Sequence, residues 1–96
     1  MAEGKGYYRG TADALVHQGA CLLYSVVVLV SVTGGDVTIY DGQDTTSGRR
    51  VARVEGIADV NTVVDFQGVV LSRGLYVDVG SSVTEYTVVW KPLVAA

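Results

Sequence analysis

The sequence predicts an all-β domain, and three observations carry this prediction. Twenty valines and eight threonines dominate a chain of 96 residues with a single proline, and β-branched side chains fit a pleated sheet better than a helix. Several segments alternate apolar and polar residues with a period of two, as strands with one buried face do. Turn signals separate these segments at roughly regular spacing. We therefore expect an antiparallel β-sandwich with jelly-roll-like connections and about seven or eight short strands.

The longest apolar run, Leu22–Val32, is predicted to be a strand. It contains five valines, whose restricted side-chain rotamers disfavour a helix. At 11 residues it is about half the ~20 needed to cross a bilayer as a helix, so we expect no membrane span. Read at a strict period of two, both of its faces are apolar, which predicts a strand covered on both sides.

The next two strands follow from turn chemistry. Gly34 and Gly35 supply the backbone freedom of a tight hairpin, which leads into a strand over Asp36–Tyr40. The turn-rich loop of residues 41–48 then precedes a partly exposed strand over Arg49–Glu55.

The second half of the chain predicts four more strands. Gly68 is expected to end the first of them, and a three-residue hairpin loop, Ser72–Gly74, is expected to separate the second from the third. Pro92 stops the last one because proline cannot donate to a ladder. The predicted strands are Val60–Gln67, Val69–Leu71, Leu75–Val79 and Val83–Trp90.

Residues 1–10 are predicted to form a flexible N-terminal arm, and residues 11–96 a single sandwich domain. Gly4, Gly6 and Gly10 make ordering of the arm costly in entropy. Its aromatic and basic side chains belong to types enriched at protein interfaces. We expect the arm to dock on a partner; the alternative is a terminal strand packed on its own domain. The candidate contact residues are Tyr7, Tyr8 and Arg9.

A second candidate partner-binding set is the basic cluster Arg49, Arg50 and Arg53. Alternation along a strand predicts that Arg49 and Arg53 share one face, where they would contact an acidic partner. A charged strand edge that prevents aggregation explains the same residues equally well.

Charge and hydropathy narrow the classes of partner. The formal net charge of −3 and the pI near 4.8 argue against nucleic-acid binding, which needs a basic excess. The chain is 49% hydrophobic and its mean hydropathy is +0.35. The interior of so small a domain cannot bury this many apolar side chains. We therefore predict self-association through an apolar surface.

No catalytic, metal-binding or cofactor-binding site is expected. The single His17 and the single Cys21 cannot supply the three or four ligands of a metal site. No serine lies in a nucleophile-elbow context, so enzymatic activity is not expected. Trp90 is expected in the core or in a subunit interface. Three turn aspartates are attributed to capping of backbone amides rather than to calcium binding; they are Asp36, Asp41 and Asp44.

About the last sixty residues resemble the small β-sandwich proteins encoded among the virion structural genes of tailed bacteriophages. The segments that carry the resemblance are Ile39–Gly42, Asp65–Val69, Gly74–Val77 and Val88–Pro92.

This resemblance implies a head decoration or cement protein at the capsid surface. Such proteins are typically trimers that bridge subunits of the major capsid protein. The alternative is a receptor-binding or carbohydrate-binding module of a phage tail or fibre.

Overall fold

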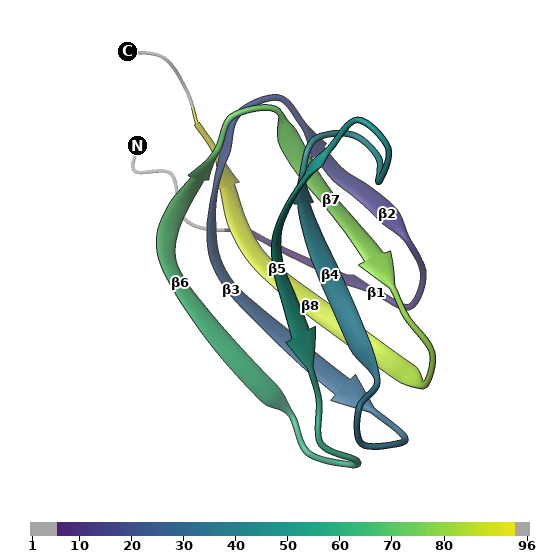
Figure 1. Ribbon diagram of the computed structural model, residues 1–96. Helices are drawn as coiled ribbons and strands as arrows, with labels where there is room; N and C mark the ends of the chain where they lie inside the picture. The colour runs from purple at the N-terminus through teal and green to yellow at the C-terminus, as the bar shows by residue number, and fades with distance from the viewer. Residues whose placement is uncertain (1–5, 94–96) are drawn as a thin grey trace.

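The chain is all-β, as predicted. The computed structural model describes residues 6–93, which contain eight strands and no helix (Figure 1). Within this part of the chain there is accordingly no helix that would cross a membrane. The strands are β1 (Gly6–Gly10), β2 (Ala14–Gln18), β3 (Cys21–Val30), β4 (Asp36–Asp41), β5 (Arg49–Glu55), β6 (Thr62–Leu71), β7 (Gly74–Val79) and β8 (Val83–Pro92).

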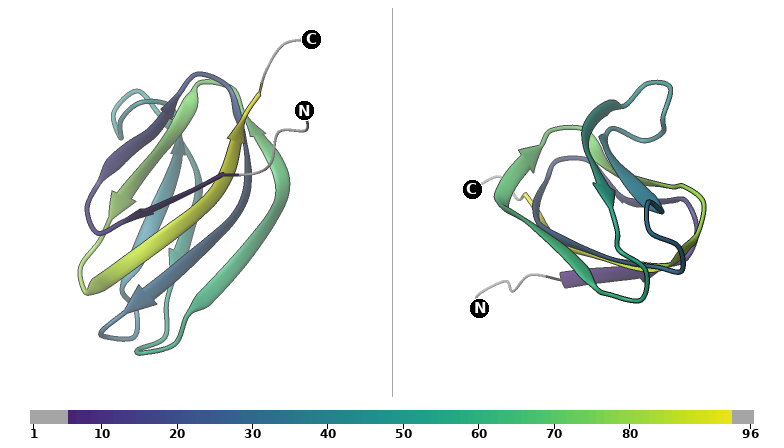
Figure 2. Two further views of the ribbon diagram at one scale, coloured as in Figure 1. Left: turned by 180° about the vertical axis from the view of Figure 1, so that it is seen from behind. Right: turned by 60° about the horizontal axis from the view of Figure 1, so that its bottom comes forward.

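The strands form two four-stranded antiparallel sheets packed face to face (Figure 2). The strand orders are β1-β8-β3-β6 and β2-β7-β4-β5. The chain is therefore one long hairpin wound into two layers, in which β4 pairs with β5, β3 with β6, β2 with β7 and β1 with β8. This winding is that of a jelly roll.

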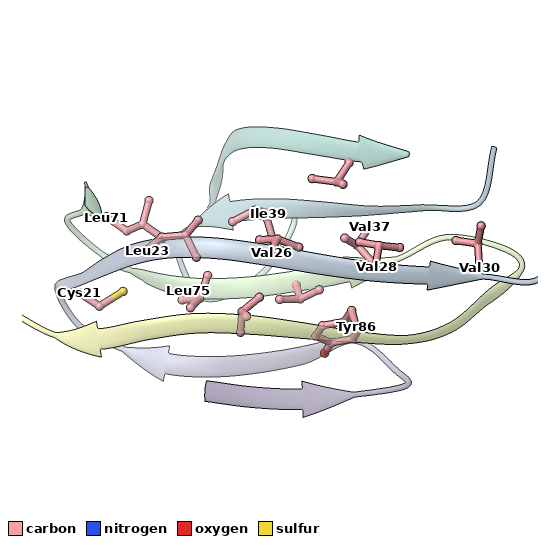
Figure 3. Close-up of a cluster of buried hydrophobic side chains, with 13 residues drawn as sticks. Cys21, Leu23, Val26, Val28, Val30, Val37, Ile39, Leu71, Leu75 and Tyr86 are labelled. Atoms are coloured by element: carbon pink, nitrogen blue, oxygen red, sulfur yellow. The ribbon is translucent and has the colours of Figure 1, made fainter. Parts of the chain in front are cut away.

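The core lies between the two sheets and is built almost entirely of aliphatic side chains (Figure 3). Each fully buried Val or Leu contributes about 1.5–3 kcal/mol relative to an exposed one. The ring of His17 on β2 lies 4.8 Å from that of Trp90 on β8, so this pair joins the two sheets beside the core. The buried hydrophobic residues are Cys21, Leu23, Val26, Val28, Val30, Val37, Ile39, Val54, Leu71, Leu75, Val77, Tyr86 and Val88.

Strand β3 is not covered on both sides, so that prediction is corrected. Its register shifts between Leu23 and Ser25, and this bulge reverses the alternation of side chains along the strand. Cys21 and Leu23 point into the core before the bulge, and Val26, Val28 and Val30 after it. A strict period of two mixed these inward residues with outward ones, which made both faces look equally apolar.

Gly68 does not end a strand, because β6 continues from Thr62 to Leu71. Gln67 and Gly68 have φ of 58° and 83°, and this left-handed pair bulges out of the ladder opposite Tyr24 before pairing resumes. A Cβ on Gly68 would lie 3.2 Å from the ring of Tyr24. Glycine at this position is therefore required for the bulge, not for a turn.

The described half of the predicted arm is part of the sandwich, which corrects the boundary at residue 10. Gly6–Gly10 forms β1 and pairs with β8 along its whole length. The absence of a Cβ on Gly10 lets the rings of Tyr8 and Tyr86 pack there with their centroids 6.1 Å apart. Residues 1–5 of the predicted arm lie outside the described residues.

Candidate functional site

The outer face of the sheet β1-β8-β3-β6 exposes several apolar side chains. Residues paired across antiparallel strands share a face, so the register defines three cross-strand rows that point away from the core. The rows are Tyr7–Val89–Ser25–Asp65, Arg9–Thr87–Val27–Val63 and Lys91–Leu22–Val70. We call the six apolar members, Tyr7, Leu22, Val27, Val63, Val70 and Val89, the apolar face.

Three of the six side chains of the apolar face are exposed to solvent, and the other three are half-buried. Tyr7 is 75% exposed, Val63 60% and Val70 54%. Single exposed apolar residues are ordinary, whereas contiguous exposed patches mark interaction sites. A shallow hollow lies in the middle of this surface, between Tyr24 and Val89 on one side and Val63 on the other.

The predicted arm residues occupy three different environments. Tyr7 belongs to the apolar face, whereas Tyr8 packs on the buried Tyr86. The guanidinium of Arg9 forms an ion pair with the carboxylate of Glu85 on β8. The structure therefore places Tyr8 and Arg9 in contacts within their own domain, whereas Tyr7 is exposed.

The three arginines of β5 are separated by a bulge. The register shifts between Ile39 and Tyr40, so Arg50 lies opposite Tyr40 and Arg53 opposite Thr38. Arg50 and Arg53 therefore share the outer face of the second sheet, which corrects the prediction that Arg49 and Arg53 share a face. Arg53 forms ion pairs with Asp36 and Glu55.

Arg49 lies at one end of the sandwich instead. It lines a hollow of about 130 Å³ together with Asp41, Ser72 and Arg73. The side chain of Arg73 donates a hydrogen bond of 3.2 Å to the carbonyl oxygen of Ser47. Two guanidinium groups thus face the same hollow.

The outer face of the second sheet has a different chemistry. Leu15, Tyr76, Tyr40 and Arg50 follow one another across four strands, and the two tyrosine rings are edge-on with centroids 6.4 Å apart. Burial raises the pKa of Tyr76, with further contributions from nearby carboxylates such as Asp13. This row brings two aromatic rings next to a guanidinium group, whereas the rows of the first sheet mix aliphatic side chains with polar and charged ones.

Two of the turn aspartates cap loops, as expected from the sequence. Asp44 accepts hydrogen bonds from the backbone N–H groups of Thr46 and Ser47. Asp41 accepts them from Ser72 and Arg73. Burial raises the pKa of Asp41, but these N–H groups outweigh burial and leave the pKa below its usual range. These carboxylates fasten the loops at one end of the sandwich.

Within residues 6–93, no group of three or more His, Cys, Asp or Glu side chains is arranged to hold a metal ion. Cys21 is free and fully buried. Burial, assisted by Asp41, raises the pKa of its thiol from 9.0 to about 11.

We predict a specific alkaline instability from Cys21. Its folded pKa lies above the unfolded one, so the stabilisation is complete below pH 9 and is lost as the pH rises from 9.0 to about 11. This loss corresponds to about 2–3 kcal/mol. Unfolding by urea, measured at several pH values in this window, should give a steeper fall for the wild type than for Cys21→Ala. Equal slopes of unfolding free energy against pH for the two proteins would show that the Cys21 thiol does not cause the alkaline loss of stability.

The sequence signals for the apolar face were present but were hidden by the bulges. Val63, Val70 and Leu22 are ordinary valine and leucine residues in apolar runs, and only the register separates them from core residues.

Comparisons of the chain with protein-family models, with curated proteins and with solved structures found no match.

Proposed function

We propose that this chain is a structural protein of a tailed-phage particle, without enzymatic activity. In this role it is a decoration or cement protein on the capsid surface, and it stabilises the head by bridging subunits of the major capsid protein. The observation that carries the proposal is the apolar face, which exposes Tyr7, Val63 and Val70 on one side of a rigid sheet.

The fold suits a binding role of this kind. The apolar face lies on a sheet whose inner strands β8 and β3 are hydrogen-bonded on both sides, so docking orders little of the chain and costs little entropy. Burying apolar surface contributes about 25 cal/mol per Å² before the costs of association. A cement protein works through this energy, because each copy adds buried interface between capsid subunits.

The central variant is Val63→Asp, which places a charge in the apolar face. Val63 is 60% exposed, so the fold should tolerate the change, whereas an unpaired carboxylate buried against a capsid subunit is costly. We expect affinity for particles that lack the protein to fall by about tenfold or more, which is 1.4 kcal/mol or more. Cosedimentation with such particles measures this effect.

Leu15→Asp is the matched control. Leu15 is 42% exposed and lies on the outer face of the other sheet, so this variant should bind particles like the wild type. Particles without the protein should also break at lower temperature than decorated ones. Equal particle binding by Val63→Asp and wild type would contradict the proposal.

The second candidate function is a carbohydrate-binding or receptor-binding module of a tail or fibre. The observation that favours it is the row of Leu15, Tyr76, Tyr40 and Arg50 on the second sheet, because aromatic rings beside charged groups are suited to polar ligands with apolar faces. Under this alternative the two variants exchange roles: Leu15→Asp abolishes adsorption to cells, and Val63→Asp does not.

A further inference from the structure

The two ends of the sandwich carry opposite charge. The end at the top of Figure 1 contains the loops β2–β3, β4–β5 and β6–β7 and the end of β8. Four basic side chains lie at or next to this basic end, together with two aspartates. They are Arg49, Arg50, Arg73 and Lys91, with Asp41 and Asp44.

The opposite, acidic end contains the loops β1–β2, β3–β4, β5–β6 and β7–β8. Six carboxylates lie at or next to it, and two arginines. They are Asp13, Asp36, Glu55, Asp59, Asp78 and Glu85, with Arg9 and Arg53.

Ion pairing within the chain leaves this asymmetry in place. Both arginines of the acidic end already pair with carboxylates there. At the basic end, both aspartates accept backbone N–H groups. None of Arg49, Arg50 and Lys91 takes part in an ion pair with another residue of the described chain.

The acidic end also exposes apolar side chains. Val32, Ile57 and Val60 are 58%, 59% and 51% exposed in the β3–β4 and β5–β6 loops. These two loops are fastened together, since the N–H of Gly34 donates to Gly56 and the N–H of Asp59 donates to Val30. Protein interfaces commonly combine apolar side chains with charged ones.

We propose that the chain associates with itself head to tail, the basic end of one copy binding the acidic end of the next. A second copy is the occupant that the charges select, because each end is complementary to the other end and repels its own kind. Such a contact is heterologous, and it closes into a ring when the rotation between copies allows. This inference does not depend on the proposed function.

Two end variants test the proposal. Arg49→Glu combined with Arg73→Glu reverses the basic end. Glu55→Lys combined with Asp59→Asn weakens the acidic end, and asparagine tolerates the φ of 61° at position 59. Each variant alone should bind to itself about tenfold or more weakly than the wild type, because like charges meet in the first variant and most of the opposite charge is lost in the second. Light scattering after size-exclusion chromatography measures the mass of each species.

The decisive sample is a mixture of the two variants. The intact acidic end of the first still fits the intact basic end of the second, so the mixture should form one-to-one dimers that do not grow. Thr87→Glu adds a charge in the middle of a sheet and should associate like the wild type. The wild-type association should weaken between about 0.15 M and about 1 M salt.

Three results would overturn the proposal. The first is a wild type that stays monomeric at the lower salt concentration, the second is end variants that associate like the wild type, and the third is a mixture that remains as monomeric as its components. Circular dichroism of each variant establishes that it is folded before the masses are compared.

Discussion

Replacing Tyr86 with alanine should cost about 4 kcal/mol of unfolding free energy, which is a large part of the stability of a domain of this size. Tyr86 is the largest fully buried side chain and is 1% exposed. Its ring packs against the ring of Tyr8 on β1, with the two centroids 6.1 Å apart. Its hydroxyl donates a hydrogen bond of 2.8 Å to the carbonyl oxygen of Ala12. Alanine leaves a cavity and removes this bond.

Tyr86→Phe separates the two contributions. It keeps the ring but leaves the carbonyl of Ala12 without its 2.8 Å partner, so the expected cost is about 1–2 kcal/mol. Urea unfolding of the wild type and both variants measures these values. A cost for Tyr86→Ala no larger than that for Tyr86→Phe would contradict the packing role of the ring.

Gly74→Ala should be strongly destabilising, with an expected cost of about 3 kcal/mol. A Cβ on Gly74 would lie 2.7 Å from the carbonyl oxygen of Gly42 and 2.9 Å from that of His17. Both are backbone atoms, which cannot rotate away as a side chain would. The N–H of Gly42 also donates to the Gly74 carbonyl at 3.3 Å, so moving one loop disturbs the other.

Gly6→Ala is the matched control, because a Cβ there would have its nearest contact at 3.8 Å. Thermal unfolding should therefore show almost no change for Gly6→Ala and a fall of roughly 10–20 °C for Gly74→Ala. Similar midpoints for the two variants would show that the close approach of Gly74 to the backbone of Gly42 and His17 does not limit the stability of the fold.

The class of the fold follows from composition and periodicity, because valine-rich alternation and regular turns leave few alternatives to a sandwich. The strands β3, β4, β5, β7 and β8 lie close to their predicted positions. Strand β2 was not predicted: it is five residues long and its register shifts between Leu15 and His17. Such a short, bulged strand carries almost no periodic signal.

The bulges also explain why the candidate surfaces were only partly predicted. A one-residue irregularity moves every later side chain to the other face of a strand, and on β5 this places Arg50, rather than Arg49, on the same face as Arg53. No local pattern reveals such a shift, because it depends on the partner strand. The apolar face therefore emerges from the register rather than from any single segment.

The charge difference between the ends has a topological origin. Arg49 and Arg73 are 24 positions apart in the chain, and only the winding of the hairpin brings their loops to the same end. The sequence shows a net charge of −3 without showing where the charges gather. In the N-terminal segment, the glycines led to a prediction of mobility. In the structure, Gly10 instead allows the close packing of Tyr8 and Tyr86.

Cryo-electron microscopy of particles with and without this protein tests the central claim most directly. We expect extra density on the outside of the capsid, fitted by the jelly roll with the apolar face turned toward the capsid subunits. We also expect this density to span more than one subunit. Capsids that look identical with and without the protein, or density at the tail alone, would contradict the account.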